Sequence, residues 1–248
     1  MMNDLKNRVR SGWEQELQSV LARAAELGSA AVLAFDLDST LFDNLPRQAR
    51  IVREFGAARG LAALGNCAPE HFTGGWDLRV PLRNLGLSAE EAEALYPDLK
   101  QFWSDRFFTS EYCVDDVAIE GAAAFTHAVV QTGAKLAYLT GRHEGMREGS
   151  VACMAREGLV VPDGEQVVLI MKPTLAEDDD AFKRAAHLKL RELGQVLAAF
   201  DNEPTHVNDY QRVFPEAKVI HLATDHSGRP VEVARDIVSV PHFAFAQA

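Results

Sequence analysis

Five short apolar runs recur along the chain from residue 31 onward. They span residues 31–35, 135–139, 167–171, 196–200 and 217–222. Runs of this length are too short for a typical helix and are typical of strands buried on both faces. Helical spacing of apolar residues fills the intervals at about 121–132, 144–157, 178–194 and 205–213. This alternation predicts an α/β fold with a doubly wound, parallel sheet.

Two further segments are predicted to be helical. Residues 3–27 carry apolar side chains at mostly helical spacing, which predicts one amphipathic helix. The interval 43–120 is too long for a single crossover helix, contains several helical patches, and is rich in aromatic residues that can form a small core. We therefore predict a main domain of residues 1–42 and 121–248, with a separate helical module at 43–120.

Polar side chains follow three of the predicted strands, namely Asp36, Thr140 and Asp201. In parallel sheets ligands bind outside the carboxyl ends of the strands, so we expect one shared site. Asp36 and Asp38 are separated by a single residue after a buried strand. Two such carboxylates repel each other, and a divalent cation is the usual way to offset that repulsion. An Asx turn capped by Thr40 is the alternative for this segment alone.

Composition narrows the possible functions. The chain has 248 residues, a formal net charge of −11 and a pI near 5.2, which disfavours a protein that mainly binds nucleic acid. Its three cysteines have neither a disulfide-framework nor a zinc-site spacing. The histidines also lack a zinc-binding spacing. No segment approaches membrane-spanning length, so we expect a soluble protein with no membrane partner. The cysteine pattern fits a location in the reducing cytoplasm.

The segment Phe35-Asp36-Leu37-Asp38-Ser39-Thr40-Leu41-Phe42 resembles motif one of the haloacid dehalogenase superfamily. The resemblance implies that Asp36 attacks phosphorus and forms an aspartyl-phosphate, and that Asp38 is the general acid/base. Leu139-Thr140-Gly141-Arg142 is similar to motif two, which implies that Thr140, Gly141 and Arg142 bind the phosphoryl group.

Two lysines are candidates for the motif-three lysine. Lys183 lies near the start of a predicted helix and is preferred, while Lys172 directly follows a strand. Phe200-Asp201-Asn202-Glu203 is similar to motif four. The resemblance implies a Mg²⁺ cofactor held by Asp36, Asp201 and the main-chain carbonyl of Asp38.

Motif four departs from the common pattern, since many relatives carry a second aspartate where this chain has Asn202. Glu203 could serve instead, and Asp209 is a weaker candidate because it lies farther along the predicted helix. The resemblance also implies that 43–120 is a helical cap over the site. Arg79 and Arg83 in this cap could meet an anionic part of a substrate or simply be solvated.

The resemblance thus implies a magnesium-dependent phosphatase that hydrolyses a small-molecule phosphomonoester. Asp38 favours this over a dehalogenase, because dehalogenases typically lack an acid at this position. A phosphomutase and a non-catalytic binding or regulatory protein on the same fold are the alternatives. Substrate identity, oligomeric state and the roles of residues 1–29 and 223–248 have no sequence signal.

Overall fold

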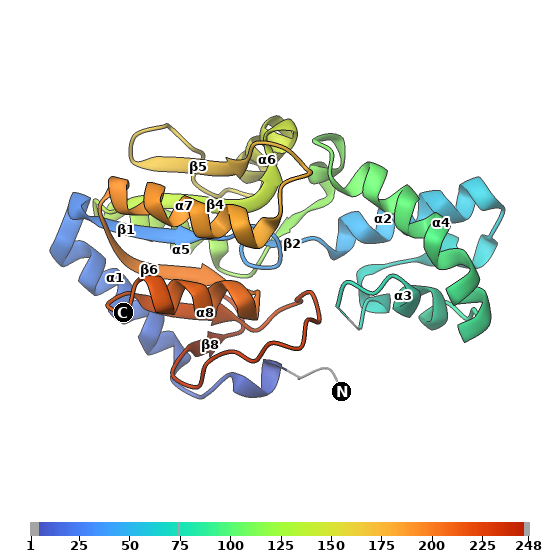
Figure 1. Cartoon of the computed structure of the whole chain (residues 1–248), viewed down its shortest axis with the longest axis horizontal. Helices are drawn as coiled ribbons and strands as arrows, with labels where there is room; N and C mark the ends of the chain where they lie inside the picture. The colour runs from blue at the N-terminus through green and yellow to red at the C-terminus, as the bar shows by residue number, and fades with distance from the viewer. Residues whose placement is uncertain (1–4, 74, 246–248) are drawn as a thin grey trace.

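The computed structural model describes residues 5–73 and 75–245 and contains a six-stranded parallel sheet (Figure 1). The strand order is β5-β4-β1-β6-β7-β8. The bounds are β1 Ala31–Phe35, β4 Lys135–His143, β5 Val167–Lys172, β6 Gln195–Asp201, β7 Lys218–Leu222 and β8 Val238–Val240. The predicted doubly wound α/β fold is confirmed. All five predicted strands are present, and β8 adds a sixth from a segment that had no assigned role.

Helices cover both faces of this sheet. They are α1 Trp13–Leu27, α5 Ala122–Gln131, α6 Arg147–Arg156, α7 Asp179–Leu193 and α8 Pro204–Val213. Side chains of β1 alternate between the two faces, as a strand requires. Leu33 and Phe35 join one apolar cluster with α1, α5 and α6, while Val32 and Ala34 join another with α7 and α8. This burial on both faces explains why β1 is apolar throughout.

The prediction of one helix over residues 3–27 is wrong at its N-terminal end. Residues 3 and 4 lie outside the described part of the chain. A short 3₁₀ helix, η1, spans Leu5–Arg8, and α1 begins only at Trp13. Between them Gly12 has a φ of 84°, a left-handed conformation that is easy for glycine but incompatible with a continuous α-helix.

The interval predicted as a helical module contains α2 Leu45–Arg59, α3 Arg79–Asn84 and α4 Ala89–Phe107. The short 3₁₀ helices here are η3 Ala62–Asn66, η4 Pro69–His71 and η5 Glu111–Asp115. The chain leaves and re-enters the main body through a two-stranded antiparallel ladder, β2 Phe42–Asp43 with β3 Val117–Ala118. These helices share an apolar cluster of their own and lie to one side of the sheet (Figure 1). The independence of this part as a domain stays a prediction.

Helix α4 is well defined at its start. The Ser88 hydroxyl accepts a hydrogen bond from the Glu91 amide, and the Glu91 carboxylate accepts one from the Ser88 amide, which forms a capping box. The helix then presents Lys100, Trp103 and Ser104 toward the main body. Nowhere in residues 5–73 and 75–245 is there a helix long and apolar enough to cross a bilayer.

Candidate active site

The carboxyl ends of three neighbouring strands bring the expected polar residues to one edge of the sheet. Strand β1 lies between β4 and β6. Asp36 directly follows β1, and its amide donates to the carbonyl of Phe200 on β6 at 2.9 Å. Asp201 is the last residue of β6, and Thr140 lies within β4. The parallel pairing therefore places these side chains at the same edge, as the sequence predicted.

Lys183 joins the two aspartates. Its Nζ lies 2.8 Å from Asp36 Oδ1 and 2.7 Å from Asp201 Oδ2, and also 3.1 Å from His206 Nδ1. Helix α7 carries this buried lysine over the ends of β1 and β6. Lys172 instead contacts Asp179, at 2.5 Å, so of the two candidates it is Lys183 that lies between Asp36 and Asp201. Its role as the motif-three lysine stays a prediction.

Burial dominates the electrostatics of this group. Burial and the charges of Asp201 and Asp38 raise the pKa of Asp36 to about 7, although Lys183 opposes the shift. Burial would also raise the pKa of Asp201, but Lys183 and His206 outweigh it and lower that pKa. The pKa of Lys183 is raised by the two aspartates despite its burial. Asp201 and Lys183 are therefore ionised, while the charge on Asp36 is only partly compensated.

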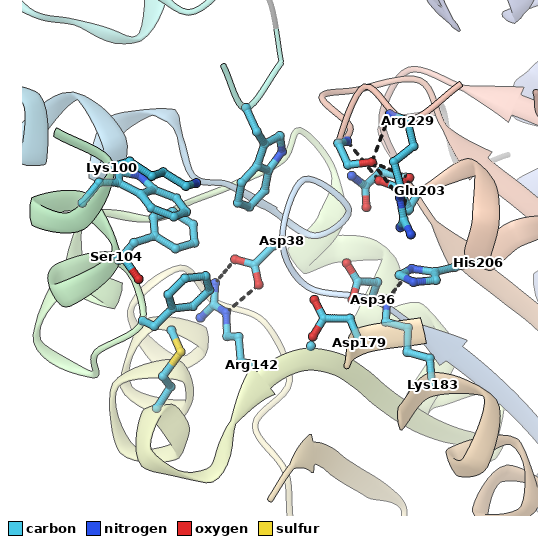
Figure 2. Close-up of a pocket in the computed structure, with 18 residues that line it drawn as sticks. Asp36, Asp38, Lys100, Ser104, Arg142, Asp179, Lys183, Glu203, His206 and Arg229 are labelled. Carbon is cyan, nitrogen blue, oxygen red and sulfur yellow. Dashed lines mark hydrogen bonds and ion pairs between the residues drawn. The ribbon is translucent and has the colours of Figure 1, made fainter. Parts of the chain in front are cut away.

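Asp38 belongs to a second, separate ion-pair network. Its carboxylate accepts hydrogen bonds from Arg142 Nε at 3.0 Å, Arg142 Nη2 at 2.8 Å and Arg47 Nη2 at 2.9 Å. Both arginines also contact the buried Asp116, at 2.6 and 2.9 Å. Burial would raise the pKa of Asp38, but Arg142 and Arg47 outweigh it and lower that pKa to about 2. Figure 2 shows the Asp38 carboxylate directed toward Arg142 rather than toward Asp36.

The three predicted phosphoryl-binding residues differ in their burial and in the partners that they already have. Thr140 is fully buried, and its hydroxyl accepts a hydrogen bond from the Arg142 amide at 3.1 Å. Gly141 lines the cavity, and a Cβ at this position would lie 3.1 Å from the Asp179 carboxylate, so a side chain would crowd it. The Arg142 guanidinium is engaged by Asp38 and Asp116. Phosphoryl binding by these residues stays a prediction.

The site opens into a cavity of about 360 Å³ between the sheet edge and the helical cap (Figure 2). Asp36, Asp38 and Lys183 line its inner side together with Glu203 and His206. Its outer wall is aromatic and comes from the cap. The lining residues there are Trp76, Trp103, Phe107 and Phe108, with Lys100 and Ser104 beside them.

Motif four has a structural explanation for its departure from the common pattern. Asn202 Oδ1 accepts a hydrogen bond from the Thr40 hydroxyl at 3.2 Å, and its Nδ2 donates to the Asp225 carbonyl at 2.5 Å. An aspartate could not make the second bond, because it has no donor. Asn202 therefore ties the turn after Asp38 to the loop that follows β7.

The two acidic candidates near motif four are bound elsewhere. The Glu203 carboxylate accepts hydrogen bonds from the Ser227 amide and hydroxyl, at 3.0 and 2.8 Å, and lies 3.4 Å from Arg229. Asp209 pairs with Arg212 at 2.6 Å and is not among the cavity-lining residues. Glu203 thus reaches the cavity, whereas Asp209 does not.

Several residues of the site had no signal in the sequence. Arg47 and Asp116 complete the Asp38 network from the cap and its return segment. Asp180 and Arg229 close the opposite side, where Arg229 binds Asp180 at 2.7 Å and Asp180 accepts from His206 at 2.9 Å. These charges are far apart in sequence and meet only through packing. Arg79 pairs with Asp77 and Glu93 and is absent from the cavity lining. The alternative in which Arg79 meets an anionic part of a substrate is therefore not supported by its position.

The oxygen donors at the sheet edge suit a hard cation. In the described part of the chain no three His, Cys, Asp or Glu side chains are grouped as ligands of one ion. The expected set needs only two, Asp36 and Asp201, because its third protein donor is a main-chain carbonyl. Carboxylate and carbonyl oxygens are preferred by Mg²⁺, which also keeps several waters. Burial and the neighbouring charges of Asp201 and Asp38 raise the pKa of Asp36, and a cation bound beside it would offset these effects, so the residues fit the group.

Comparisons with known proteins bear on the fold. Neither a scan against protein-family models nor a search of curated proteins found a match. Among solved structures, a haloacid dehalogenase-like hydrolase from Streptococcus pneumoniae matches with a TM-score of 0.50, at 10% identity, over 85% of this chain and 94% of its own. A candidate phosphatase from Clostridium difficile matches with a TM-score of 0.50, at 12% identity, over 84% and 95%. The chain has the haloacid dehalogenase-like fold.

At 10–12% identity this likeness concerns the fold alone. A chain of the Pnkp1/Rnl/Hen1 RNA repair complex also matches, with a TM-score of 0.44 and 13% identity over 78% of this chain. The present chain spans only 42% of the length of that protein. Within the haloacid dehalogenase-like fold, the chemistry of this chain must therefore be argued from its own site.

Proposed function

We propose that this protein hydrolyses a small-molecule phosphomonoester, with Asp36 as the nucleophile. The observation that carries the proposal is the position of Lys183, whose ammonium lies within 2.8 Å of both Asp36 and Asp201 at the floor of the cavity. A buried carboxylate beside a fixed cation can attack phosphorus, while the cation stabilises negative charge on the phosphoryl oxygens.

In the first step a carboxylate oxygen of Asp36 forms a bond to phosphorus as the ester oxygen leaves. The product is an aspartyl-phosphate on Asp36 and a free alcohol. Lys183 keeps the carboxylate in place through its bond to Oδ1. The Thr140 hydroxyl and the Gly141 backbone are proposed to orient the phosphoryl oxygens. In the second step water attacks phosphorus, which restores Asp36 and releases phosphate.

Asp38 is proposed to move the protons of both steps. It can protonate the leaving oxygen only after it has itself taken up a proton, and Arg47 and Arg142 oppose that by stabilising the carboxylate. We therefore expect the Asp38 side chain to separate from at least one arginine before the alcohol leaves. Afterwards the ionised carboxylate can take a proton from the attacking water.

The proposed cofactor is Mg²⁺, held by Asp36, Asp201 and the Asp38 carbonyl. When bound, it supplies positive charge that neutralises the phosphoryl oxygens. A cytoplasmic location is proposed with it, on the sequence argument alone.

The test is phosphate release from a panel of phosphomonoesters, with Mg²⁺ or with a chelator. Wild type is compared with Asp36→Asn and with the control Asp209→Asn, each checked for folding by circular dichroism. We expect Mg²⁺-dependent release that falls by at least about 10³-fold in Asp36→Asn, because a nucleophile is lost, and persists in the control. Release that survives in Asp36→Asn would remove Asp36 as nucleophile, and no release by wild type would contradict the proposed activity.

A further inference from the structure

The outer wall of the cavity is a set of aromatic rings held by one another. The Trp103 and Phe107 rings stack with centroids 4.4 Å apart. Trp76 meets both edge-on, at 6.1 and 5.3 Å, and Phe108 meets Phe107 edge-on at 5.2 Å. These rings come from α4, from Phe108 directly after it and from the loop before α3, and all four line the cavity. A wall whose rings are already fixed loses little conformational entropy when a flat ligand packs on it.

Lys100 lies on this wall without an acidic partner. Its Nζ is 3.9 Å from the centroid of the Trp103 ring, and its half-buried position lowers its pKa. Figure 2 shows the side chain running along the wall on the cap side of the cavity, with Ser104 on the same helix. In the described part of the chain no carboxylate forms an ion pair with Lys100.

The other lysine and arginine side chains that line the cavity are already neutralised. Lys183 binds Asp36 and Asp201, Arg142 binds Asp38, and Arg229 binds Asp180. Each of these cations would lose an existing partner if it turned to a new anion. Lys100 would lose only a ring contact, so it is the cation that a second anionic group of a ligand would meet at least cost.

Trp103 carries a buried donor that no described residue satisfies. Its side chain is almost completely buried, with 3% of the residue exposed, and its Nε1 has no hydrogen-bond acceptor among the described residues. A buried donor without an acceptor is uncommon in folded proteins, because it costs free energy.

Building on the proposed function, we propose that the substrate is a phosphomonoester whose leaving group is a single flat ring with an anionic substituent. The phosphoryl group sits at Asp36, the ring packs against Trp76, and the anionic substituent pairs with Lys100. The cavity volume of about 360 Å³ is near the lower end of the range of about 300–1,000 Å³ for small-molecule pockets. That size favours one ring over a larger leaving group.

The charge test uses two nearly isosteric substrates, 4-carboxyphenyl phosphate and 4-carbamoylphenyl phosphate. We measure kcat/KM for both with wild type, Lys100→Gln, Lys100→Arg and the control Lys189→Gln, an exposed lysine on α7. The ratio between the two substrates cancels general effects on the enzyme. We expect the preference for the carboxylate to fall by about tenfold or more in Lys100→Gln, mainly through KM, because a charged hydrogen bond is lost. It should persist in Lys100→Arg and Lys189→Gln.

The ring test compares phenyl phosphate with glycerol 2-phosphate in wild type, Trp76→Leu and the control Tyr96→Leu, a cap aromatic outside the cavity. We expect the wild-type preference for the ring to fall by about tenfold in Trp76→Leu only, because stacking is lost. A preference for glycerol 2-phosphate, or equal carboxylate selectivity in Lys100→Gln and wild type, would overturn this inference and leave the phosphatase activity standing.

Binding of benzylphosphonate and 4-carboxybenzylphosphonate, measured by calorimetry, separates the remaining outcomes. These compounds are not hydrolysed, so they report on the cavity without the reaction. One outcome is that 4-carboxybenzylphosphonate binds more tightly than benzylphosphonate, that this difference requires Lys100, and that no ester is hydrolysed. This result would support the proposed ligand preference of the cavity and overturn the proposed activity. If no ester is hydrolysed and the carboxylate compound binds no more tightly than benzylphosphonate, both the proposed activity and the proposed pocket are overturned.

Discussion

The Arg142 guanidinium makes two hydrogen bonds to the Asp38 carboxylate, at 3.0 and 2.8 Å. Arg47 of the cap binds the same carboxylate, so one side chain of the main body is shared by a strand-end arginine and a cap arginine. The network is balanced, because Asp116 supplies the second negative charge. The network couples Asp38, the proposed general acid/base, to the position of α2. A movement of the cap would therefore affect proton transfer by Asp38 as well as the entry of ligands into the cavity.

Arg47→Met should destabilise the protein in a pH-dependent way. The pKa of Asp38 is about 2 in the folded protein, below its usual value of about 3.9. The Asp38 pairing thus adds stability above about pH 4, and that stability is lost as the pH falls toward 2. We expect a loss of about 3–5 kcal/mol at pH 7, since a buried partner is removed, and a smaller loss at pH 3.

Urea unfolding at the two pH values measures this effect. Arg50→Met is the matched control on the same helix, because Arg50 pairs with more exposed acids, Glu54 and Asp115. The control should cost about 1 kcal/mol or less. Equal losses at pH 7 and pH 3 in Arg47→Met would show that charge pairing is not the cause.

Lys183→Met should reduce both stability and activity. Asp36 and Asp201 would remain buried without their shared cation, so we expect a loss of about 3–5 kcal/mol in the free energy of unfolding. Phosphate release per folded molecule should fall by at least about 10²-fold, because the Lys183 ammonium would no longer stabilise negative charge on the phosphoryl oxygens. Lys172→Met should retain activity, and the opposite result would make Lys172 the motif-three lysine.

Mg²⁺ should stabilise the folded protein through Asp201. At a concentration 100 times the Kd, a ligand of the folded state adds about 2.7 kcal/mol, which corresponds to a rise in Tm of about 5–10 °C for a chain of this size. We expect this rise in wild type and in the control Asp209→Asn, and its loss in Asp201→Asn, by differential scanning calorimetry. The same rise in all three proteins would exclude Asp201 as a ligand.

Asn202→Asp should destabilise the protein even though the two side chains have nearly the same shape. The Nδ2 donor to the Asp225 carbonyl would be replaced by an oxygen, so two acceptors would face each other. We expect a loss of about 1–3 kcal/mol by urea unfolding at pH 7. A variant as stable as wild type would show that the Asn202 bridge is dispensable.

Buried histidines should make stability fall in mild acid. Burial lowers the pKa of both His187 and His221 to about 4, below the usual 6.5. Between about pH 6.5 and pH 4 these two histidines are protonated in the unfolded chain but mostly neutral in the folded protein. The free energy of unfolding therefore decreases as the pH falls through this range. His187→Phe keeps a ring near Tyr210 and Phe214 and removes one titrating group.

The expected result is a weaker pH dependence in His187→Phe, with the difference reaching about 2–3 kcal/mol near pH 4. Unfolding by urea at several pH values between 4 and 7 measures it. Parallel curves for the two proteins would show that His187 does not titrate in this range.

The order of strands and helices along the chain, and the sheet edge where the site lies, follow from the pattern of apolar and polar residues. Apolar alternation and buried runs are local properties, so β1, β4, β5, β6 and β7 could be predicted within a few residues, together with the shared edge where Asp36, Thr140 and Asp201 lie. The pairing of β1 with β6, which sets Asp36 beside Asp201, came only from the structure. The short strand β8 and the break at Gly12 were not predictable. The first is brief and lies in a weakly patterned tail, and the second depends on a left-handed glycine.

Which charged side chains meet depends on how the helices and strands pack. Lys183 and Asp36 are 147 positions apart, and the choice between Lys183 and Lys172 depends on how α7 sits over the sheet. Arg47 reaches Asp38 from the first turn of α2, and Lys100 remains without an acidic partner because α4 places it on an aromatic wall. Ion pairs and cavities are set by distances between packed elements, and such distances are not encoded in any local pattern of the chain.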